Sequence, residues 1–198
     1  MLKKTLRFVN EDIMFPRRYA FLTAELSPFL QGVRSILDVG SSNGRLIQQI
    51  ASGLGDVSVS GVDINVQPNS VIPIRAYDGK VLPYADGSFE CVLLIDVLHH
   101  AEDPEALLAE ASRVASKNVL IKDHYWNNQL DWFVLKWADY FGNHPLGITL
   151  PYNYLNVAAW HRAFTHAQLE ILSEKAFMKL SYDPCKHIIY HLAKKSVA

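Results

Sequence analysis

The sequence predicts an α/β fold with a mostly parallel sheet, and three observations support this prediction. Apolar segments short enough for strands alternate with amphipathic segments from about residue 33 to residue 119. The run 89–95 is almost entirely apolar, which is typical of a parallel strand covered on both faces. Two strand-like segments end near Asp38 and Asp63, so acidic side chains are expected at the carboxyl ends of strands, where open sheets of this class bind ligands.

Size and charge narrow the class of protein further. With 198 residues, 49% of them hydrophobic and 20% charged, the chain is expected to form a single domain over residues 1–198 with a sizeable core. Its formal net charge of −1 lacks the basic excess of proteins that grip nucleic acid, so nucleic acid is not an expected partner. No stretch approaches the roughly 20 apolar residues of a membrane span. The two cysteines suit a reducing compartment, and a soluble, cytoplasmic protein is expected.

The individual elements follow from apolar periodicity and from signals at their ends. Asp103 precedes Pro104 and an apolar pattern at helical spacing, which predicts a helix capped by the Asp103 side chain. The amphipathic residues after Gly44 predict a helix directly after the first strand. The predicted strands are 36–39, 57–63, 71–76, 89–95 and 119–121, and the predicted helices between them are 46–51 and 104–114.

The composition changes after His124. Residues 125–164 hold 11 of the 22 aromatic residues of the chain, including all four tryptophans. Residues 130–141 are expected to form a helix. Thr165 suits the N-cap of a further helix over 166–176. Two short strand-like runs, 178–182 and 188–193, are expected to close the chain.

The segment Gly40-Ser41-Ser42-Asn43-Gly44 predicts a loop that holds a nucleotide-like cofactor. Small residues let the backbone approach a ligand closely, and the start of the following helix favours negative charge. The dinucleotide fingerprint G-x-G-x-x-G fits poorly, because the outer glycines are four positions apart rather than five and Ser42 replaces the middle one. The segment also matches G-x-S-x-G, the nucleophile elbow of α/β-hydrolases, although that elbow belongs deeper in its fold.

Acidic residues follow the next two strands. Asp63 lies 19 positions after Gly44, where a carboxylate accepts hydrogen bonds from a ribose diol, and its alternative role is that of a plain turn aspartate. Asp78, in Tyr77-Asp78-Gly79, is placed to meet an adenine amino group, and an Asp-Gly turn explains it nearly as well. The order of these acids favours a cofactor that contains a nucleoside.

Five motifs in order resemble a known family. The chain is similar to the class I S-adenosylmethionine-dependent methyltransferases, and more narrowly to the compact branch that acts mostly on small molecules. The resemblance covers residues 33–124 and, more weakly, the last two strands. The motifs are Asp38-Val-Gly-Ser-Ser-Asn-Gly, Val62-Asp63, Asp78-Gly-Lys-Val-Leu-Pro-Tyr-Ala-Asp-Gly-Ser-Phe-Glu, Asp96-Val-Leu-His-His-Ala-Glu-Asp-Pro and Glu110-Ala-Ser-Arg-Val.

This resemblance implies a Rossmann-like sheet of seven mostly parallel strands, with helices on both faces and the last strand antiparallel. It implies S-adenosylmethionine as the cofactor and methyl transfer to an O, N or C atom of a small-molecule acceptor. The family usually has Gly where Ser42 stands, and the added hydroxyl should not block the cofactor. The residues that the resemblance assigns to the cofactor are Asp38, Gly40, Ser42, Gly44, Asp63, Ile64, Asp78, Gly79 and Asp96.

A sulfonium activates its own methyl group, so the protein mainly has to align the acceptor, with a general base where the acceptor loses a proton. His99, His100 and His124 lie near the ends of the fourth and fifth predicted strands, and His100 and His124 are the candidates for that base, with packing or capping as the alternative. No metal is expected. Asp96 and Asp123 faintly resemble the metal-binding acids of catechol-type methyltransferases, but His124 stands where those enzymes have Asn.

The aromatic segment 125–164 is the expected substrate pocket or lid, with Trp126, Tyr152, Tyr154 and Trp160 as candidate acceptor contacts. The alternative is that its helix only packs on the core, since Leu130, Phe133, Val134, Trp137 and Phe141 fall at core spacing. Two other functions stay open, a hydrolase with Ser42 as nucleophile and a non-catalytic regulatory module that binds S-adenosylmethionine. The sequence leaves the acceptor and the oligomeric state undetermined.

Overall fold

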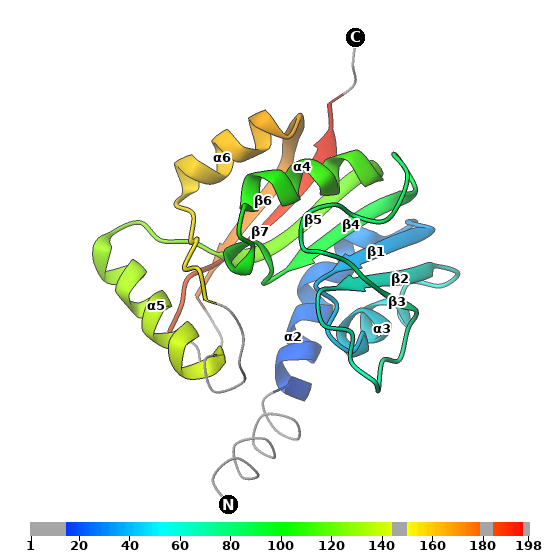
Figure 1. The fold of residues 1–198 in the computed structure, drawn as a ribbon, viewed down its shortest axis with the longest axis horizontal. Helices are drawn as coiled ribbons and strands as arrows, with labels where there is room; N and C mark the ends of the chain where they lie inside the picture. The colour runs from blue at the N-terminus through cyan, green and yellow to red at the C-terminus, as the bar shows by residue number, and fades with distance from the viewer. Residues whose placement is uncertain (1–14, 144–149, 179–183, 196–198) are drawn as a thin grey trace, which may run out of the picture.

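A computed structural model describes residues 15–143, 150–178 and 184–195, and its strands form one seven-stranded sheet in the order β3-β2-β1-β4-β5-β7-β6 (Figure 1). Strands β1 to β5 pair in parallel, and β7 runs antiparallel to both of its neighbours, β5 and β6. This confirms the predicted fold class, including the antiparallel last strand. The strands are β1 Ser35–Val39, β2 Ser58–Asp63, β3 Ile74–Ala76, β4 Phe89–Ile95, β5 Ala115–His124, β6 Leu169–Phe177 and β7 His187–Lys194.

Helices cover both faces of the sheet, as expected. One face packs against α2, η2 and α3, and the other packs against α4 and α6, so each face of the central strands has its own cluster of buried apolar side chains. This two-sided burial explains why the β4 sequence is apolar almost throughout. The helices are α2 Phe15–Leu26, η2 Ser27–Leu30, α3 Arg45–Ala51, η3 Leu98–His100, α4 Pro104–Val114, α5 Gln129–Asn143 and α6 Val157–His166.

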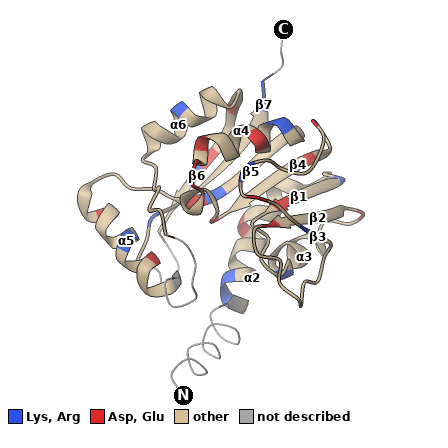
Figure 2. Ribbon diagram, viewed as in Figure 1, with Lys and Arg blue, Asp and Glu red and all other residues tan. Residues whose placement is uncertain are grey.

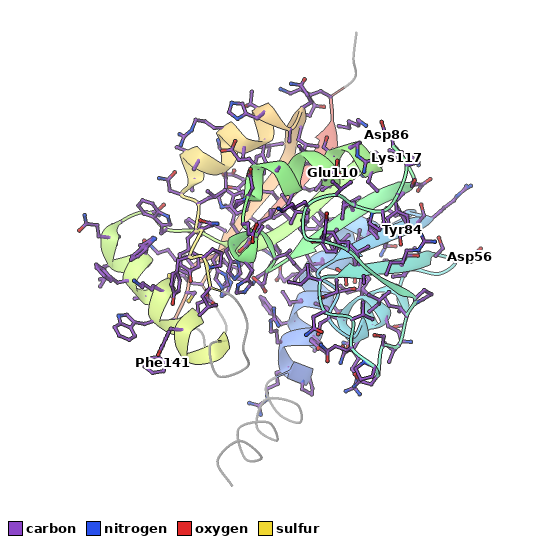
Figure 3. The ribbon with its side chains drawn as sticks, viewed as in Figure 1. Asp56, Tyr84, Asp86, Glu110, Lys117 and Phe141 are labelled. Carbon is purple, nitrogen blue, oxygen red and sulfur yellow. The ribbon has the colours of Figure 1, made fainter. Side chains whose placement is uncertain are left out.

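The parallel register brings the carboxyl ends of the central strands to one edge. Val39 of β1 pairs with Val62 of β2 and with Leu94 of β4, and Ile95 of β4 pairs with Lys122 of β5. Helix α5 lies beyond this edge (Figure 1). Figure 3 labels Phe141 on α5 on one side of the molecule and Asp56 and Lys117, near the amino ends of β2 and β5, on the opposite side.

Two cap predictions had opposite outcomes. The Asp103 side chain accepts a hydrogen bond from the Ala106 amide at 3.0 Å and caps α4, as predicted. The prediction that Thr165 starts a helix over 166–176 is wrong, because α6 ends at His166 and its N-cap is Asn156. The Thr165 hydroxyl instead donates to the His161 carbonyl within α6.

The segment predicted as that last helix is the edge strand β6. Its backbone pairs with β7 from Leu169 to Phe177, so sheet pairing overrides its weak helical pattern. The predicted strand over 178–182 lies almost wholly outside the described residues, and the predicted strand 71–76 is shortened to Ile74–Ala76.

Among the described residues, acidic and basic residues are both distributed along the helices, strands and loops of the ribbon (Figure 2). This distribution agrees with the formal net charge of −1. Within the described ranges, the helices are all too short or too polar to cross a membrane.

Candidate functional site

The loop between β1 and α3 is built on two glycines with left-handed backbone conformations. Gly40 has φ +70°, and a Cβ placed there would lie 2.6 Å from Cγ2 of Val97. Gly44 has φ +79°, and a Cβ there would lie 2.4 Å from Cγ1 of Ile72. Both positions therefore exclude a side chain on conformational and on steric grounds. The result is a tight turn with bare backbone at the carboxyl end of β1.

Asp63 fastens this loop to the end of β2. Its Oδ2 accepts a hydrogen bond from the Ser42 amide at 2.8 Å, and its Oδ1 accepts one from the Asn65 amide at 2.8 Å. Ser42 itself has a positive φ of 52°. The carboxylate thus fixes the conformation of the loop while it lines the adjacent cavity.

The other two predicted acids near this loop differ in their surroundings. Asp38 is 5% exposed, and burial, together with the nearby charge of Asp63, raises its pKa to about 8. Asp78 is exposed, and hydrogen bonds from the Val81 and Lys80 amides hold its pKa below the usual range. Asp78 therefore does form the turn considered as its alternative role, and it also lines the cavity.

A cavity of about 1290 Å³ opens at this edge of the sheet. It exceeds the roughly 300–1,000 Å³ of ordinary small-molecule pockets, so it has room for more than one ligand. Of the cofactor residues predicted from the sequence, Asp38 and Gly44 do not line it. Those that do are Gly40, Ser42, Asp63, Ile64, Asp78, Gly79 and Asp96.

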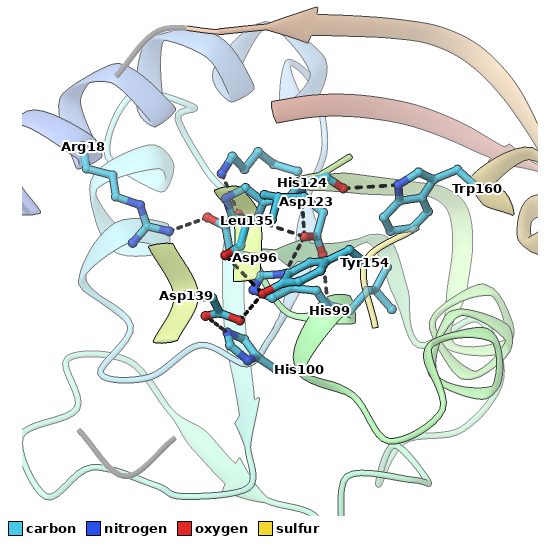
Figure 4. A network of polar contacts seen from close by, with 12 residues as sticks. Arg18, Asp96, His99, His100, Asp123, His124, Leu135, Asp139, Tyr154 and Trp160 are labelled. Carbon is cyan, nitrogen blue, oxygen red and sulfur yellow. Dashed lines mark hydrogen bonds and ion pairs between the residues drawn. The ribbon is translucent and has the colours of Figure 1, made fainter. Parts of the chain in front are cut away.

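Asp96 lines the cavity and belongs to a cluster of polar side chains (Figure 4). Its carboxylate accepts hydrogen bonds from Lys122 Nζ at 2.6 Å and from Arg18 Nη2 at 2.5 Å. Burial alone would raise the pKa of Asp96, but the positive charges of Lys122 and Arg18 outweigh it and hold the pKa well below the usual range. Asp96 is thus an anion whose side chain is 13% exposed, and its φ of +55° is a strained backbone conformation for a residue other than glycine.

His99 and Asp123 form a buried pair in the same cluster. Nδ1 of His99 lies 2.5 Å from Oδ1 of Asp123, and the two side chains are 5% and 0% exposed. The amides of Leu98 and His124 also donate to the Asp123 carboxylate. Burial lowers the pKa of His99, but the carboxylate of Asp123 outweighs this effect and raises it overall. Because Nδ1 is engaged by Asp123, Nε2 is the ring atom left to meet a ligand.

The two histidines predicted as bases also line the cavity. His100 Nε2 lies 4.0 Å from Oδ1 of Asp139, a residue of α5 whose Oδ2 accepts a hydrogen bond from the Tyr154 hydroxyl at 2.6 Å. His124 Nδ1 lies 3.7 Å from Asp96 Oδ1. Burial lowers the pKa of His124 to about 4, so this ring is neutral near pH 7.

The acids considered as metal ligands each have a cationic partner. Asp96 pairs with Lys122 and Arg18, and Asp123 pairs with His99. Their carboxylates therefore do not form a bare acidic pair, and this donor set fits Mg²⁺ poorly because a lysine ammonium lies within hydrogen-bond distance of one of them.

The four aromatic residues predicted to contact an acceptor are not part of the cavity wall. Trp160 is 2% exposed and packs in the core against Phe164 and Tyr190. Trp126 donates to the Tyr154 carbonyl, and Tyr152 and Trp126 pack around a small buried cluster that includes Tyr154. Tyr154 contacts the site through its hydrogen bond to Asp139 and through its ring, which stacks on the His99 ring with the centroids 5.8 Å apart.

Residues that the sequence reasoning missed complete the wall. Lys122 is a charged residue inside the apolar β5 sequence, which is a signal that could have identified it. Arg18 lies 78 positions before Asp96 and carries no local signal. For the apolar residues of α5 the sequence left two roles open, a substrate pocket or lid and packing on the core. Those that line the cavity are Leu130, Phe133, Trp137 and Phe141.

Comparisons with known proteins agree with this geometry. Residues 37–121 match the family model described as a methyltransferase domain. The chain is 32% identical over 104 residues to 27-O-demethylrifamycin SV methyltransferase from Amycolatopsis mediterranei, covering 46% of this chain and 38% of that protein. The chain thus spans well under half the length of this curated relative.

Solved structures share the fold at low identity. A methyltransferase in complex with the Haloferax volcanii Trm112 methyltransferase activator has a TM-score of 0.73 at 15% identity, with 97% of this chain and 96% of that chain covered. The [4+2]-cyclase SpnF has a TM-score of 0.64 at 15% identity, with 90% of this chain and 80% of that chain covered. At this identity the two structures establish the shared fold alone.

Proposed function

We propose that the chain is a class I S-adenosylmethionine-dependent methyltransferase, with S-adenosylmethionine as its cofactor, and that it methylates a small-molecule acceptor. The observation that carries this proposal is the single cavity, which joins the residues beside the β1–α3 loop to the cluster of His99, His100, His124 and Asp139. A cofactor at one end and a protic acceptor at the other would meet near Asp96. The scattered charges and the net charge of −1 favour a small molecule over nucleic acid.

The wall beside the loop fits the cofactor. Asp63 and Asp78 offer oxygen atoms to the hydroxyl and amino groups of a nucleoside, and the bare backbone at Gly40 leaves space beside them. When bound, the cofactor supplies an electrophilic methyl group. The remaining predicted cofactor contacts, Ser42, Ile64 and Gly79, stay part of this proposal, with Asp38 and Gly44 supporting the loop from behind.

We propose an oxygen atom as the methylated atom and His99 as its general base. The curated relative is named for a substrate with a demethylated oxygen, and a hydroxyl needs a base to become a good nucleophile. Nε2 of His99 would take the hydroxyl proton as the new O–C bond forms, and Asp123 would hold the ring in place and stabilise the imidazolium. His124 is a weaker candidate, because its pKa of about 4 makes its protonated form unstable. His100 stays a candidate through its position beside Asp139.

The hydrolase alternative has little support. Among the described residues, the Ser42 amide donates a hydrogen bond to Asp63, and no histidine forms a hydrogen bond with the Ser42 hydroxyl. A hydrolytic triad requires such a histidine. The cyclase SpnF has the same fold under a name that describes a different reaction, so the fold by itself does not identify methyl transfer, and the regulatory alternative is left to experiment. Cys91 and Cys185 form no disulfide with each other, which suits the expected cytoplasmic location.

The test is a thermal shift titration with S-adenosylhomocysteine beside NADH. A ligand at 100 times its dissociation constant stabilises the folded state by about 2.7 kcal/mol, which corresponds to several degrees for a chain of this size. We expect a saturable shift with S-adenosylhomocysteine only, and at least a tenfold loss of its affinity in Asp63→Ala. A shift with NADH alone, or with neither ligand, contradicts the proposal. A normal shift without transfer to any of a panel of hydroxyl acceptors favours the regulatory alternative.

A further inference from the structure

Helix α5 presents its apolar stripe outward, the reverse of an ordinary surface helix. Leu130, Phe133, Trp137 and Phe141 follow one another at helical spacing and are 72%, 51%, 57% and 69% exposed. We call these four residues the α5 stripe. An amphipathic helix normally buries such a stripe against its core, and large exposed apolar patches usually mark binding surfaces.

The opposite side of the same helix faces the protein and carries a polar group. Leu135 is buried with Tyr154 and Cys185, and Asp139 is 8% exposed. Asp139 lines the cavity beside His100, and the Tyr154 hydroxyl fixes its carboxylate. One helix therefore supplies an apolar surface and a fixed hydrogen-bond acceptor to the same cavity.

The α5 stripe and the cofactor residues share this cavity. The stripe extends over about 16 Å, given the 1.5 Å rise per residue of an α-helix. The cavity of about 1290 Å³ leaves room for a second molecule next to the cofactor. A molecule that fits this arrangement has a protic head near His99, His100 and Asp139 and an apolar body that leaves the cavity along α5.

We propose that the acceptor is a hydroxyl compound with an extended apolar chain, and that this chain lies along the α5 stripe. This inference rests on the proposed function, because it names the acceptor class of the same site. Burial of the chain would remove both the ligand and four large side chains from water, which gives binding energy without any charged contact. It explains why the stripe is apolar although it is not part of the core.

A lipid surface is a weaker explanation for the stripe. Helices that lie on membranes are rich in Lys and Arg on their polar face. The α5 sequence has one basic residue, Lys136, and two acidic residues, Asp131 and Asp139. Membrane docking and self-association are therefore outcomes that the experiment has to separate from acceptor binding.

The experiment measures binding of phenol, 4-butylphenol and 4-octylphenol to the full chain by calorimetry, at saturating S-adenosylhomocysteine and below micellar concentrations. We expect the affinity to rise about fourfold for each methylene that becomes buried. In the double variant Phe133→Ser/Trp137→Ser this dependence on chain length should be lost. Both residues are exposed, so the fold should not suffer. Leu172→Ser is the matched control, because Leu172 is 52% exposed on β6, away from the cavity wall, and should keep the dependence.

Equal affinity across the series, or a dependence that the double variant retains, overturns the inference. It is also overturned if the wild-type chain sediments with phosphatidylcholine vesicles or forms a dimer, and if this association is lost in the double variant but kept in Leu172→Ser. These results leave the proposed function intact as long as S-adenosylhomocysteine binds. Failure of S-adenosylhomocysteine to bind overturns the proposed function itself, so the two failures are distinguishable.

Discussion

At the scale of single residues, the site depends on ion pairs between carboxylates and cationic side chains that are largely shielded from solvent. Asp96 forms ion pairs with Lys122 and Arg18, and Asp123 forms an ion pair with His99 (Figure 4). Breaking such a pair leaves an uncompensated buried charge, which costs more than the pair contributes when intact. The positions of these side chains are therefore tightly coupled, and the titration of one depends on the charge of its partner.

This coupling predicts the pH dependence of methyl transfer. Asp123 raises the pKa of His99, and only the neutral ring accepts a proton, so we expect the rate to fall about tenfold per pH unit below that pKa and to level off above it. In Asp123→Asn the rising limb should move to lower pH, because the charge that raised the pKa is gone. The maximal rate should also fall, because the ring loses its orientation. The measurement is kcat/KM against pH. A limb that persists in His99→Gln and disappears in His100→Gln would assign the base to His100 instead.

At the scale of elements, local signals and sheet pairing compete. Asp103 caps α4 through its hydrogen bond to Ala106, and this helix covers the face of the sheet next to β4 and β5. Thr165 has the same kind of side chain for a cap but lies in the last turn of α6, where β6 follows immediately. A capping side chain predicts a helix start only where the following residues are free to form one.

We expect Asp103→Ala to lower the free energy of unfolding by about 1 kcal/mol, the usual contribution of an N-cap. Thr165→Ala should change it by less than about 0.5 kcal/mol, because the Thr165 side chain is exposed and satisfies no helix-starting amide. Urea denaturation of both variants measures the difference. Equal losses in the two variants would contradict the assignment of the caps.

At the scale of the whole molecule, the aromatic residues are divided between the core and the site. Trp160 lies in the apolar cluster between α4, α6 and the sheet, and Trp137 lies on the exposed stripe of α5. Trp160→Ala should therefore lower the free energy of unfolding by about 3–5 kcal/mol, whereas Trp137→Ala should change it by no more than about 0.5 kcal/mol. Denaturant unfolding tests this contrast. A large loss in Trp137→Ala would mean that the α5 stripe packs in solution and is not available to an acceptor.

The fold and the part of the cavity wall beside the β1–α3 loop could be predicted from the sequence because their signals are local. The Gly40–Gly44 turn, the acid at the end of β2 and the apolar β4 run each depend on a few consecutive residues, and the parallel alternation forces their ends to one edge. The antiparallel last strand followed from the family resemblance, and the sheet topology confirmed it.

The cavity wall around His99, His100 and Asp139 depends on contacts between distant segments, so only the tertiary structure could determine it. Arg18 meets Asp96 across 78 positions, and Asp139 meets His100 only because α5 lies beyond the strand ends. The periodicity of α5 identified which residues share a face, but it had no information on whether that face points inward or outward. The same limit explains why the prediction for Trp160 failed. A tryptophan side chain suits a ligand contact, but the position of Trp160 on α6 places it in the core. The sequence by itself determined most of the elements and the residues that meet beside the β1–α3 loop, since those are properties of short segments. Packing determined which side chains share a cavity, because that depends on how whole elements are arranged in space.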